Sequence, residues 1–228
     1  GDAPRGPTVM TPQVAARESD KEPDEIRATR DGFLIGADDG LMLSAKMLAG
    51  ASECPDGPPC LAPWSMRGAG GLSPSGSKAE DIWVRPDGAS AWITLQKDSR
   101  NGQHRGHRLI RVALPDLRVI SDFQFDRDRE AHHPPNSPRD HGPGPEIVRE
   151  DATTNTLIVT LDNYGTVLLT DLDAALEGRL ENSVQICTAA DGSAGNSYPD
   201  RVVIITRPGA SLAVVANAGP EGGVAVID

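Results

Sequence analysis

Four acidic residues recur along the chain in similar surroundings, and their side chains could do chemistry together. They are Glu25, Asp81, Glu146 and Asp200, separated by 56, 65 and 54 residues, and each opens a short β-rich run. In the first two repeats another acid, Asp24 or Glu80, comes directly before, so the alignment of the repeats can shift by one residue there. Carboxylates that meet repel unless a positive charge lies between them, and hard cations prefer oxygen ligands. The set predicts a site for calcium or another divalent metal; the alternative is that these acids only lead into strands.

A second set of polar residues keeps the same uneven period. It consists of Asp38, Gln96, Asp162 and Asn217, which end the second β-rich run of each unit at intervals of 58, 66 and 55 residues. Two independent markers with one period indicate an internal repeat. We expect these side chains to accept or donate hydrogen bonds to the backbone of the turn that follows, as Asx-type residues do.

All five histidines lie within 38 residues, in two loops: His104, His107, His132, His133 and His141. Imidazoles suit zinc, copper or iron, so His132, His133 and His141 form a second candidate for a metal or partner site. The adjacent His132 and His133 precede two prolines, which gives no helix or strand that would aim both rings at one ion. A Pro-rich loop with a role in partner recognition or as a lid is therefore the alternative.

Three cysteines give a weak indication of location. Cys54 and Cys60 stand in the turn-rich loop "ECPDGPPC", where a small disulfide is expected because the further ligands of a zinc site are missing. A disulfide favours export, so the sequence predicts a secreted or periplasmic protein. Cys187, in the apolar stretch "SVQICTA", is expected to be a buried thiol.

The elements that must position these residues are short strands in a fourfold repeat. The units begin "DEIRATRDGFLIGADDG", "EDIWVRPDGASAWITLQ", "PEIVREDATTNTLIVTLD" and "PDRVVIITRPGASLAVVAN", and third strands follow as "LMLSAKM", "RLIRVAL", "TVLLTDL" and "GVAVID". Turn residues separate these runs, and fourth strands follow as "RVISDFQF" and "NSVQICT". Three to four strands repeated at about 40 to 60 residues predict an all-β fold of the β-propeller type. A single short helix is expected in "DLDAALEGRL".

Two stretches, "VRPDGASAWITLQ" and "TRPGASLAVVANAGPEGGVAVID", resemble the YVTN-type β-propeller repeat. This repeat is shared by surface-layer-like proteins, lactonase-like propellers and metal-dependent hydrolases. The resemblance implies a β-propeller domain over residues 23–228, after a flexible leader at residues 1–22. Four units are fewer than the seven usual in the family. The chain is therefore either a piece of a larger, seven-bladed propeller or a four-bladed ring in which "GPTVMTPQV" supplies a closing outer strand.

The resemblance also implies where the four acids lie. The first strand of a propeller blade is innermost, so the residues that open these strands would surround one mouth of a central channel. A cation held there could polarise an ester or phosphoester oxygen, or activate a bound water.

Composition excludes several classes of function. The net charge of −11 argues against nucleic acid as a partner, because phosphate binding relies on Lys and Arg. No run of about 18 apolar residues exists, which predicts no membrane span. No nucleotide-binding loop or nucleophile elbow is present.

The sequence thus favours an exported scaffold that binds a protein or a small-molecule ligand. The alternative is a metal-dependent hydrolase of the lactonase or phosphoesterase type. A histidine-metal oxidoreductase is a third class.

Overall fold

The computed structural model describes residues 23–29, 32–37, 42–46, 62–64, 77–97, 107–114, 117–125, 144–189, 198–208, 210–219 and 222–228. Several predicted features lie outside these residues: Asp38, the disulfide of Cys54 and Cys60, the loop with His132, His133 and His141, and the segment "GPTVMTPQV". In the described residues nearly all regular structure is β-strand, and the prediction of an all-β chain is confirmed.

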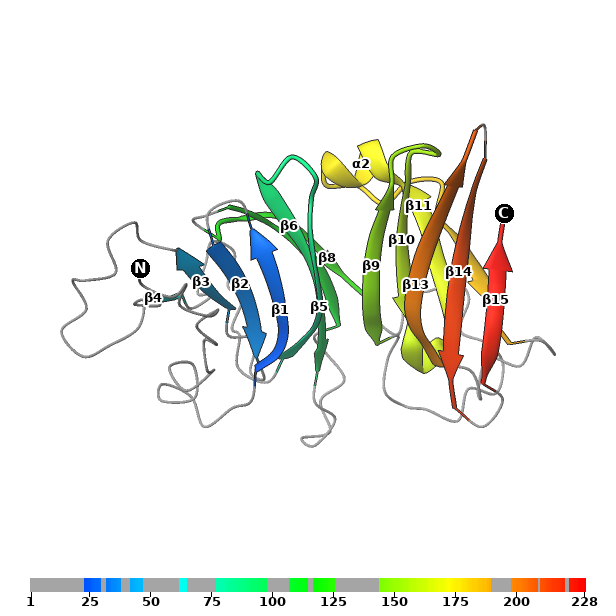
Figure 1. Cartoon of the computed structure of the whole chain (residues 1–228), viewed down its shortest axis with the longest axis horizontal. Coiled ribbons are helices and arrows are strands. Elements are labelled where there is room, and N and C mark those ends of the chain that lie inside the picture. Colours follow the sequence, from blue (N-terminus) through cyan, green and yellow to red (C-terminus); the bar gives the residue numbers. More distant parts are fainter. Residues whose placement is uncertain are drawn as a thin grey trace, which may run out of the picture.

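The strands form four antiparallel sheets that follow one another in chain order (Figure 1). Sheet I contains β1 (Pro23–Thr29), β2 (Gly32–Ala37), β3 (Met42–Lys46) and β4 (Ala62–Trp64). Sheet II contains β5 (Ser77–Val84), β6 (Ser90–Lys97), β7 (Arg108–Ala113) and β8 (Val119–Gln124). Sheet III contains β9 (Pro145–Asp151), β10 (Thr156–Leu161), β11 (Thr166–Asp171) and β12 (Val184–Cys187). Sheet IV contains β13 (Tyr198–Arg207), β14 (Ala210–Ala218) and β15 (Gly223–Ile227).

In each sheet the strands pair in sequence order, and short hairpin turns join several of the consecutive strands. The β5–β6 hairpin is an example: Arg85 N donates to Ser90 O over 3.0 Å, and Gly88 has φ +66°, which glycine adopts without strain. The strand β4 was not anticipated by the repeat pattern. Sheet IV has three strands in the described residues, whereas the other three sheets have four.

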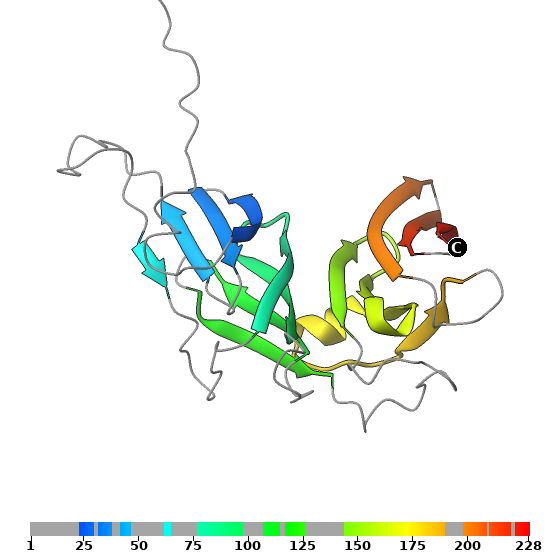
Figure 2. The ribbon, with the colours of Figure 1, turned by 90° about the horizontal axis from the view of Figure 1, so that it is seen from below.

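The sheets stack face to face, one after another, and do not close on themselves; sheets I and IV lie at opposite ends (Figures 1 and 2). Their first strands β1, β5, β9 and β13 are neighbours across the stack. Successive side chains of a strand point to opposite faces of its sheet, so one strand can pack against the sheets on both sides. On β6, Ile93 packs toward sheet I and Trp92 toward sheet III.

Three apolar clusters fill the three junctions. Between sheets I and II lie Leu34, Ala79, Ile82, Ala91, Ile93, Leu95, Ile110, Val112 and Leu117. Between sheets II and III lie Trp92, Leu109, Phe123, Phe125, Val148, Leu157, Val159, Leu161, Tyr164, Leu168, Leu172 and Ala175. Between sheets III and IV lie Ile147, Ile158, Val167, Val202, Ala213 and Val215. Both faces of the middle sheets are therefore buried, which requires apolar residues at consecutive strand positions.

The predicted helix is confirmed as α2 (Leu172–Leu176), whose first turn is capped by Asp171 Oδ1 accepting from Ala174 N at 2.8 Å. It joins β11 to β12. Cys187, expected to be buried, is a free thiol and is partly exposed, because β12 is the last strand of its sheet. Among the described helices, none has the length and apolar character needed to cross a bilayer.

Candidate functional site

A β-bulge near the start of each first strand decides how the four acids align. In sheet II the pairing passes from Ala79↔Leu95 to Asp81↔Thr94, so Glu80 is the extra residue. The same shift occurs in the other three sheets and leaves Asp24, Glu146 and Asp200 as the extra residues. Equivalent positions are therefore Asp24, Glu80, Glu146 and Asp200, and one residue later Glu25, Asp81, Ile147 and Arg201. The predicted set mixes these two positions because adjacent acids hide a one-residue bulge.

A threonine on the second strand holds the bulge in two of the sheets. Thr94 Oγ1 accepts a hydrogen bond from Asp81 N at 2.9 Å, and Thr160 Oγ1 accepts from Ile147 N at 2.9 Å. The matching contacts confirm that Asp81 and Ile147 are equivalent. Thr94 Oγ1 also donates to Glu146 O at 2.7 Å, so the same hydroxyl ties sheet II to sheet III.

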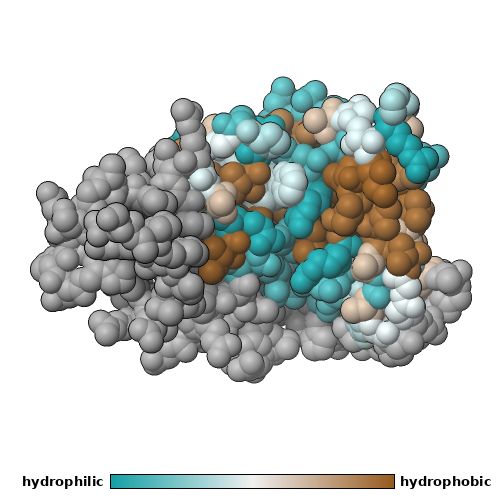
Figure 3. Space-filling view, viewed as in Figure 1, coloured by the Kyte–Doolittle hydropathy of each residue, from teal (hydrophilic) through white to brown (hydrophobic). Residues whose placement is uncertain are grey.

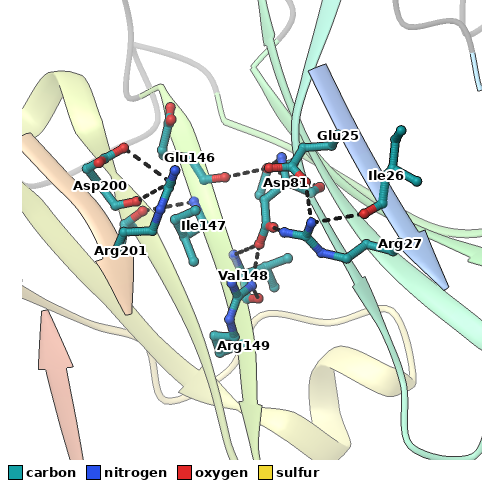
Figure 4. A network of polar contacts seen from close by, with 12 residues as sticks. Glu25, Ile26, Arg27, Asp81, Glu146, Ile147, Val148, Arg149, Asp200 and Arg201 are labelled. Atoms are coloured by element: carbon teal, nitrogen blue, oxygen red, sulfur yellow. Dashed lines mark hydrogen bonds and ion pairs between the residues drawn. The ribbon is translucent and has the colours of Figure 1, made fainter. Parts of the chain in front are cut away.

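Asp81 is the centre of a polar network on the first strands (Figure 4). Its side chain is fully buried. One carboxylate oxygen accepts from Arg27 of sheet I at 2.9 Å, and the other accepts from Val148 N at 3.0 Å and from Arg149 of sheet III. Because a buried carboxylate is costly without partners, these three donors explain how an acid can lie at this junction.

The network continues outward on both sides of Asp81. Arg27 forms a second ion pair with Glu25 on its own strand. The Arg149 guanidinium lies over the ring of Trp83, 5.0 Å from its centroid, a cation–π contact. Glu25, Arg27, Asp81 and Arg149 thus alternate in sign across three sheets, and the arginines supply positive charge beside the two acids.

The other two predicted acids lie beside this group in different settings. Glu146 Oε2 accepts from Gln96 Nε2 at 2.7 Å across the junction of sheets II and III. Asp200 pairs at 3.3 Å with Arg201, and both side chains are largely exposed. Within the described residues no group of three or more His, Cys, Asp and Glu side chains is arranged to hold a metal ion. The role of the four acids as metal ligands stays a prediction.

Two members of the second polar set differ from expectation. Gln96 donates to the carboxylate of Glu146 in the neighbouring sheet, and Asn217 Nδ2 donates at 3.1 Å to Thr188 O, just after the end of β12. Neither of these two bonds goes to the turn that follows the strand, because the stacking of the sheets brings the other partner within reach. Asp162 opens a short 3-10 helix, η4 (Asp162–Tyr164).

Arginines were missed by the sequence reasoning, although a signal was available. Arg27 stands two residues after Glu25, and Arg149 two residues after Ile147, so both follow the strand period of two from the bulge position. A search for charged residues of both signs at this spacing would have found them. The one histidine in the described residues, His107, is buried just before β7.

A second set of polar side chains crosses the junction of sheets II and III, at the end of the strands where the hairpins turn. Glu150 Oε1 accepts from Arg85 Nε at 2.6 Å and from Trp92 Nε1 at 2.7 Å. Arg111 lies over Trp92, with its guanidinium carbon 5.4 Å from the ring centroid, and donates to Leu176 O at 2.6 Å. Burial lowers the pKa of Arg111, the charge of Arg85 lowers it further, and Glu150 opposes both effects.

Comparisons with known proteins give a likeness of fold. No family model and no curated protein matches the sequence. The solved structure of a "putative 6-phosphogluconolactonase" from Bacteroides uniformis is similar, with a TM-score of 0.53 and 16% identity over 90% of this chain. That from Bacteroides fragilis, of the same description, has a TM-score of 0.52 and 12% identity over 90% of this chain. This chain spans 52% of the length of each. The chain therefore shares the fold of these lactonase-like structures over about half of their length.

Proposed function

We propose that this chain forms the blades of a β-propeller and belongs to a hydrolase of the lactonase type. The observation that carries the proposal is the likeness of its four stacked sheets to the two Bacteroides structures. The neighbouring first strands, the outward order of strands in each sheet and the shared bulge all agree with blades around an axis. The likeness to these two structures supports a metal-dependent or metal-free hydrolase better than a scaffold that only binds a ligand.

The substrate class that fits is the ring ester of a phosphorylated sugar acid. Hydrolysis joins a water oxygen to the ester carbonyl carbon, breaks the bond from that carbon to the ring oxygen and leaves a carboxylate and a hydroxyl. The reaction needs positive groups for the substrate anion and for the oxyanion that develops. Arg27 and Arg149, whose side chains are 36% and 17% exposed, would supply them. Glu146, which accepts from the neutral amide of Gln96, would take the proton of the water.

The test is hydrolysis of 6-phosphogluconolactone by the purified chain, followed as acid release above the spontaneous rate. We expect activity, and a loss of about 100-fold in kcat/KM for Arg149→Lys, because a Lys cannot reproduce the fork of donors. Arg179→Gln is the matched control, since Arg179 lies on an exposed loop paired with Glu177 and Glu181. No acid release above the spontaneous rate, by the wild-type chain, would refute the proposal.

The predicted divalent cation is tested in the same assay. Removal of metals with a chelator, followed by addition of calcium, separates two forms of the hydrolase. Activity that is lost with the chelator and restored by calcium supports a metal at the acids of the first strands. Activity that is unchanged supports catalysis by the arginine and carboxylate side chains alone.

A further inference from the structure

Two buried polar side chains lie side by side on sheet II without the full set of hydrogen bonds that such groups usually make. Arg111 on β7 and Ser121 on β8 are paired in register, so both side chains lie on the same face of the sheet. Only 9% of Arg111 and 6% of Ser121 is exposed. Within the described residues, neither Arg111 Nε nor Ser121 Oγ has a hydrogen-bond partner. Because buried polar groups are nearly always hydrogen-bonded, these two atoms indicate a further partner.

The face that carries this pair is the one packed on sheet III. Trp92 is the neighbour of Arg111 on β6 and is buried in the junction of sheets II and III, and the Arg111 guanidinium lies over its ring. On its other side Arg111 donates at 2.6 Å to the carbonyl oxygen of Leu176, the last residue of α2. Sheets II and III are each packed between two other sheets, so the pair lies in the interior of the stack.

The positive charge of Arg111 is not balanced by a carboxylate in contact with it. Among the described residues no Asp or Glu forms an ion pair with Arg111, and the nearby Glu150 is bonded to Arg85 Nε and Trp92 Nε1. Burial lowers the pKa of Arg111, and the charge of Arg85 lowers it further against the opposing effect of Glu150. A buried cation beside a second cation is costly unless an anion accompanies it. The local charge therefore favours a negatively charged partner over a neutral one.

Donor type and burial narrow the class of this partner. The Nε of Arg111 can only donate, and the hydroxyl of Ser121 can donate as well, so a single acceptor can serve both atoms. Both atoms are closed off from solvent. A sugar phosphate or another large anion would have to reach both of them, whereas a monatomic anion only has to lie between them. A small monovalent anion such as chloride is therefore the class that fits.

We propose that Arg111 Nε and Ser121 Oγ together bind one chloride ion between sheets II and III. The ion neutralises Arg111 and ties the two outer strands of sheet II to the side chain that holds the end of α2. Figure 3 shows hydrophilic surface over β5 and β9, on the side of the first strands where the proposed hydrolase site lies. Arg111 and Ser121 lie on the third and fourth strands of sheet II, so the anion site is separate from that site. The inference does not depend on the proposed hydrolase.

The test is thermal unfolding of the purified 228-residue chain in sodium chloride and in sodium methanesulfonate at equal concentration. Both salts screen surface charges equally, but methanesulfonate is a larger, polyatomic anion. For a dissociation constant of about 10 mM, we expect the Tm to be about 4 °C higher in about 200 mM chloride, because a ligand that binds only the folded chain stabilises it. Line broadening in chloride NMR measures the binding directly.

Two variants remove the two donors, and a third is the matched control. Ser121→Ala should at least halve the difference in Tm between the salts, because a hydrogen bond to a charged group contributes about tenfold or more in affinity. Arg111→Met, which removes the charge, should abolish the difference and the line broadening. Thr166→Val should leave both unchanged, because Thr166 is another buried hydroxyl without a hydrogen-bond partner in the described residues but lies on β11 of sheet III.

Two results would overturn the proposal. One is a wild-type chain with the same Tm in both salts, which would show that the partner of these two atoms is a neutral water molecule. The other is a chloride effect that persists in Ser121→Ala or is lost equally in Thr166→Val, which would place the ion elsewhere. If Arg111→Met does not fold, Ser121→Ala decides the question, because alanine fits the space of serine and keeps the arginine in place.

Discussion

At the scale of single residues, Asp81 shows how the stack accommodates a buried charge. Sequence alone predicts a carboxylate that needs a positive partner, and the expected partner was a cation. In the structure Arg27 and Arg149 provide positive charge from the two neighbouring sheets, with Val148 N as a third donor. The carboxylate thereby links three sheets at one point, so its removal should weaken the contacts among all three.

Asp81→Asn tests this role. The change keeps the shape but removes the charge between two arginines, so the free energy of unfolding should fall by about 2–3 kcal/mol. This is below the full cost of a broken buried pair, because both arginines are partly exposed to water. Urea denaturation at pH 7 measures it.

Asp200→Asn is the control for Asp81→Asn. Its side chain is 46% exposed and pairs with Arg201 at the surface, so a change within about 0.5 kcal/mol is expected. Equal effects of the two substitutions would show that the network around Asp81 contributes no more than an exposed pair.

At the scale of elements, the bulge at the start of each first strand is the repeated device. It shifts one residue out of register and turns the following N–H toward the second strand. There the hydroxyl of Thr94 or Thr160 accepts a hydrogen bond from that N–H. In the junction of sheets II and III the same Thr94 hydroxyl donates to Glu146 O. One side chain therefore fixes both the local register and the contact between sheets.

Thr94→Val should lower the free energy of unfolding by about 2 kcal/mol. Valine has the same shape but leaves Asp81 N and Glu146 O without this hydroxyl, and unsatisfied buried polar groups are costly. Thermal and urea unfolding measure the change.

Thr166→Val is the matched control. Thr166 is 5% exposed on β11, and its Oγ1 has no hydrogen-bond partner in the part of the chain that the structure describes. Here valine should be neutral or stabilising, because a buried hydroxyl is replaced by a methyl group. If both substitutions destabilise equally, loss of hydrogen bonds is not the cause.

At the scale of the whole molecule, stability comes from junctions between consecutive sheets. Each sheet packs on its neighbours in the chain, so the molecule resembles a linear stack of repeats. The junction of sheets II and III has the largest apolar cluster, with Trp92 fully buried and its ring centroid 6.3 Å from that of Phe123.

Trp92→Leu should lower the free energy of unfolding by about 3 kcal/mol. The change leaves a cavity between two sheets and removes one donor to Glu150, which keeps Arg85. Val184→Ala, on an exposed side chain of β12, should change it by less than about 0.5 kcal/mol. Urea unfolding followed by near-ultraviolet and far-ultraviolet circular dichroism measures both. A loss below about 1 kcal/mol for Trp92→Leu would show that this junction can repack around the smaller side chain.

The sequence by itself determined the all-β class, the fourfold repeat, most strands and the helix after Asp171. These depend on local signals: β-branched runs, turn residues and a period of two. It also located the acids of the first strands to within one residue. The bulge decided which acid occupies which position, and a bulge has no compositional signature between adjacent acids such as Glu80 and Asp81. Only the tertiary structure brought Arg27 and Arg149 to Asp81, because they are 54 and 68 residues away from it in the chain and meet it only where the sheets stack.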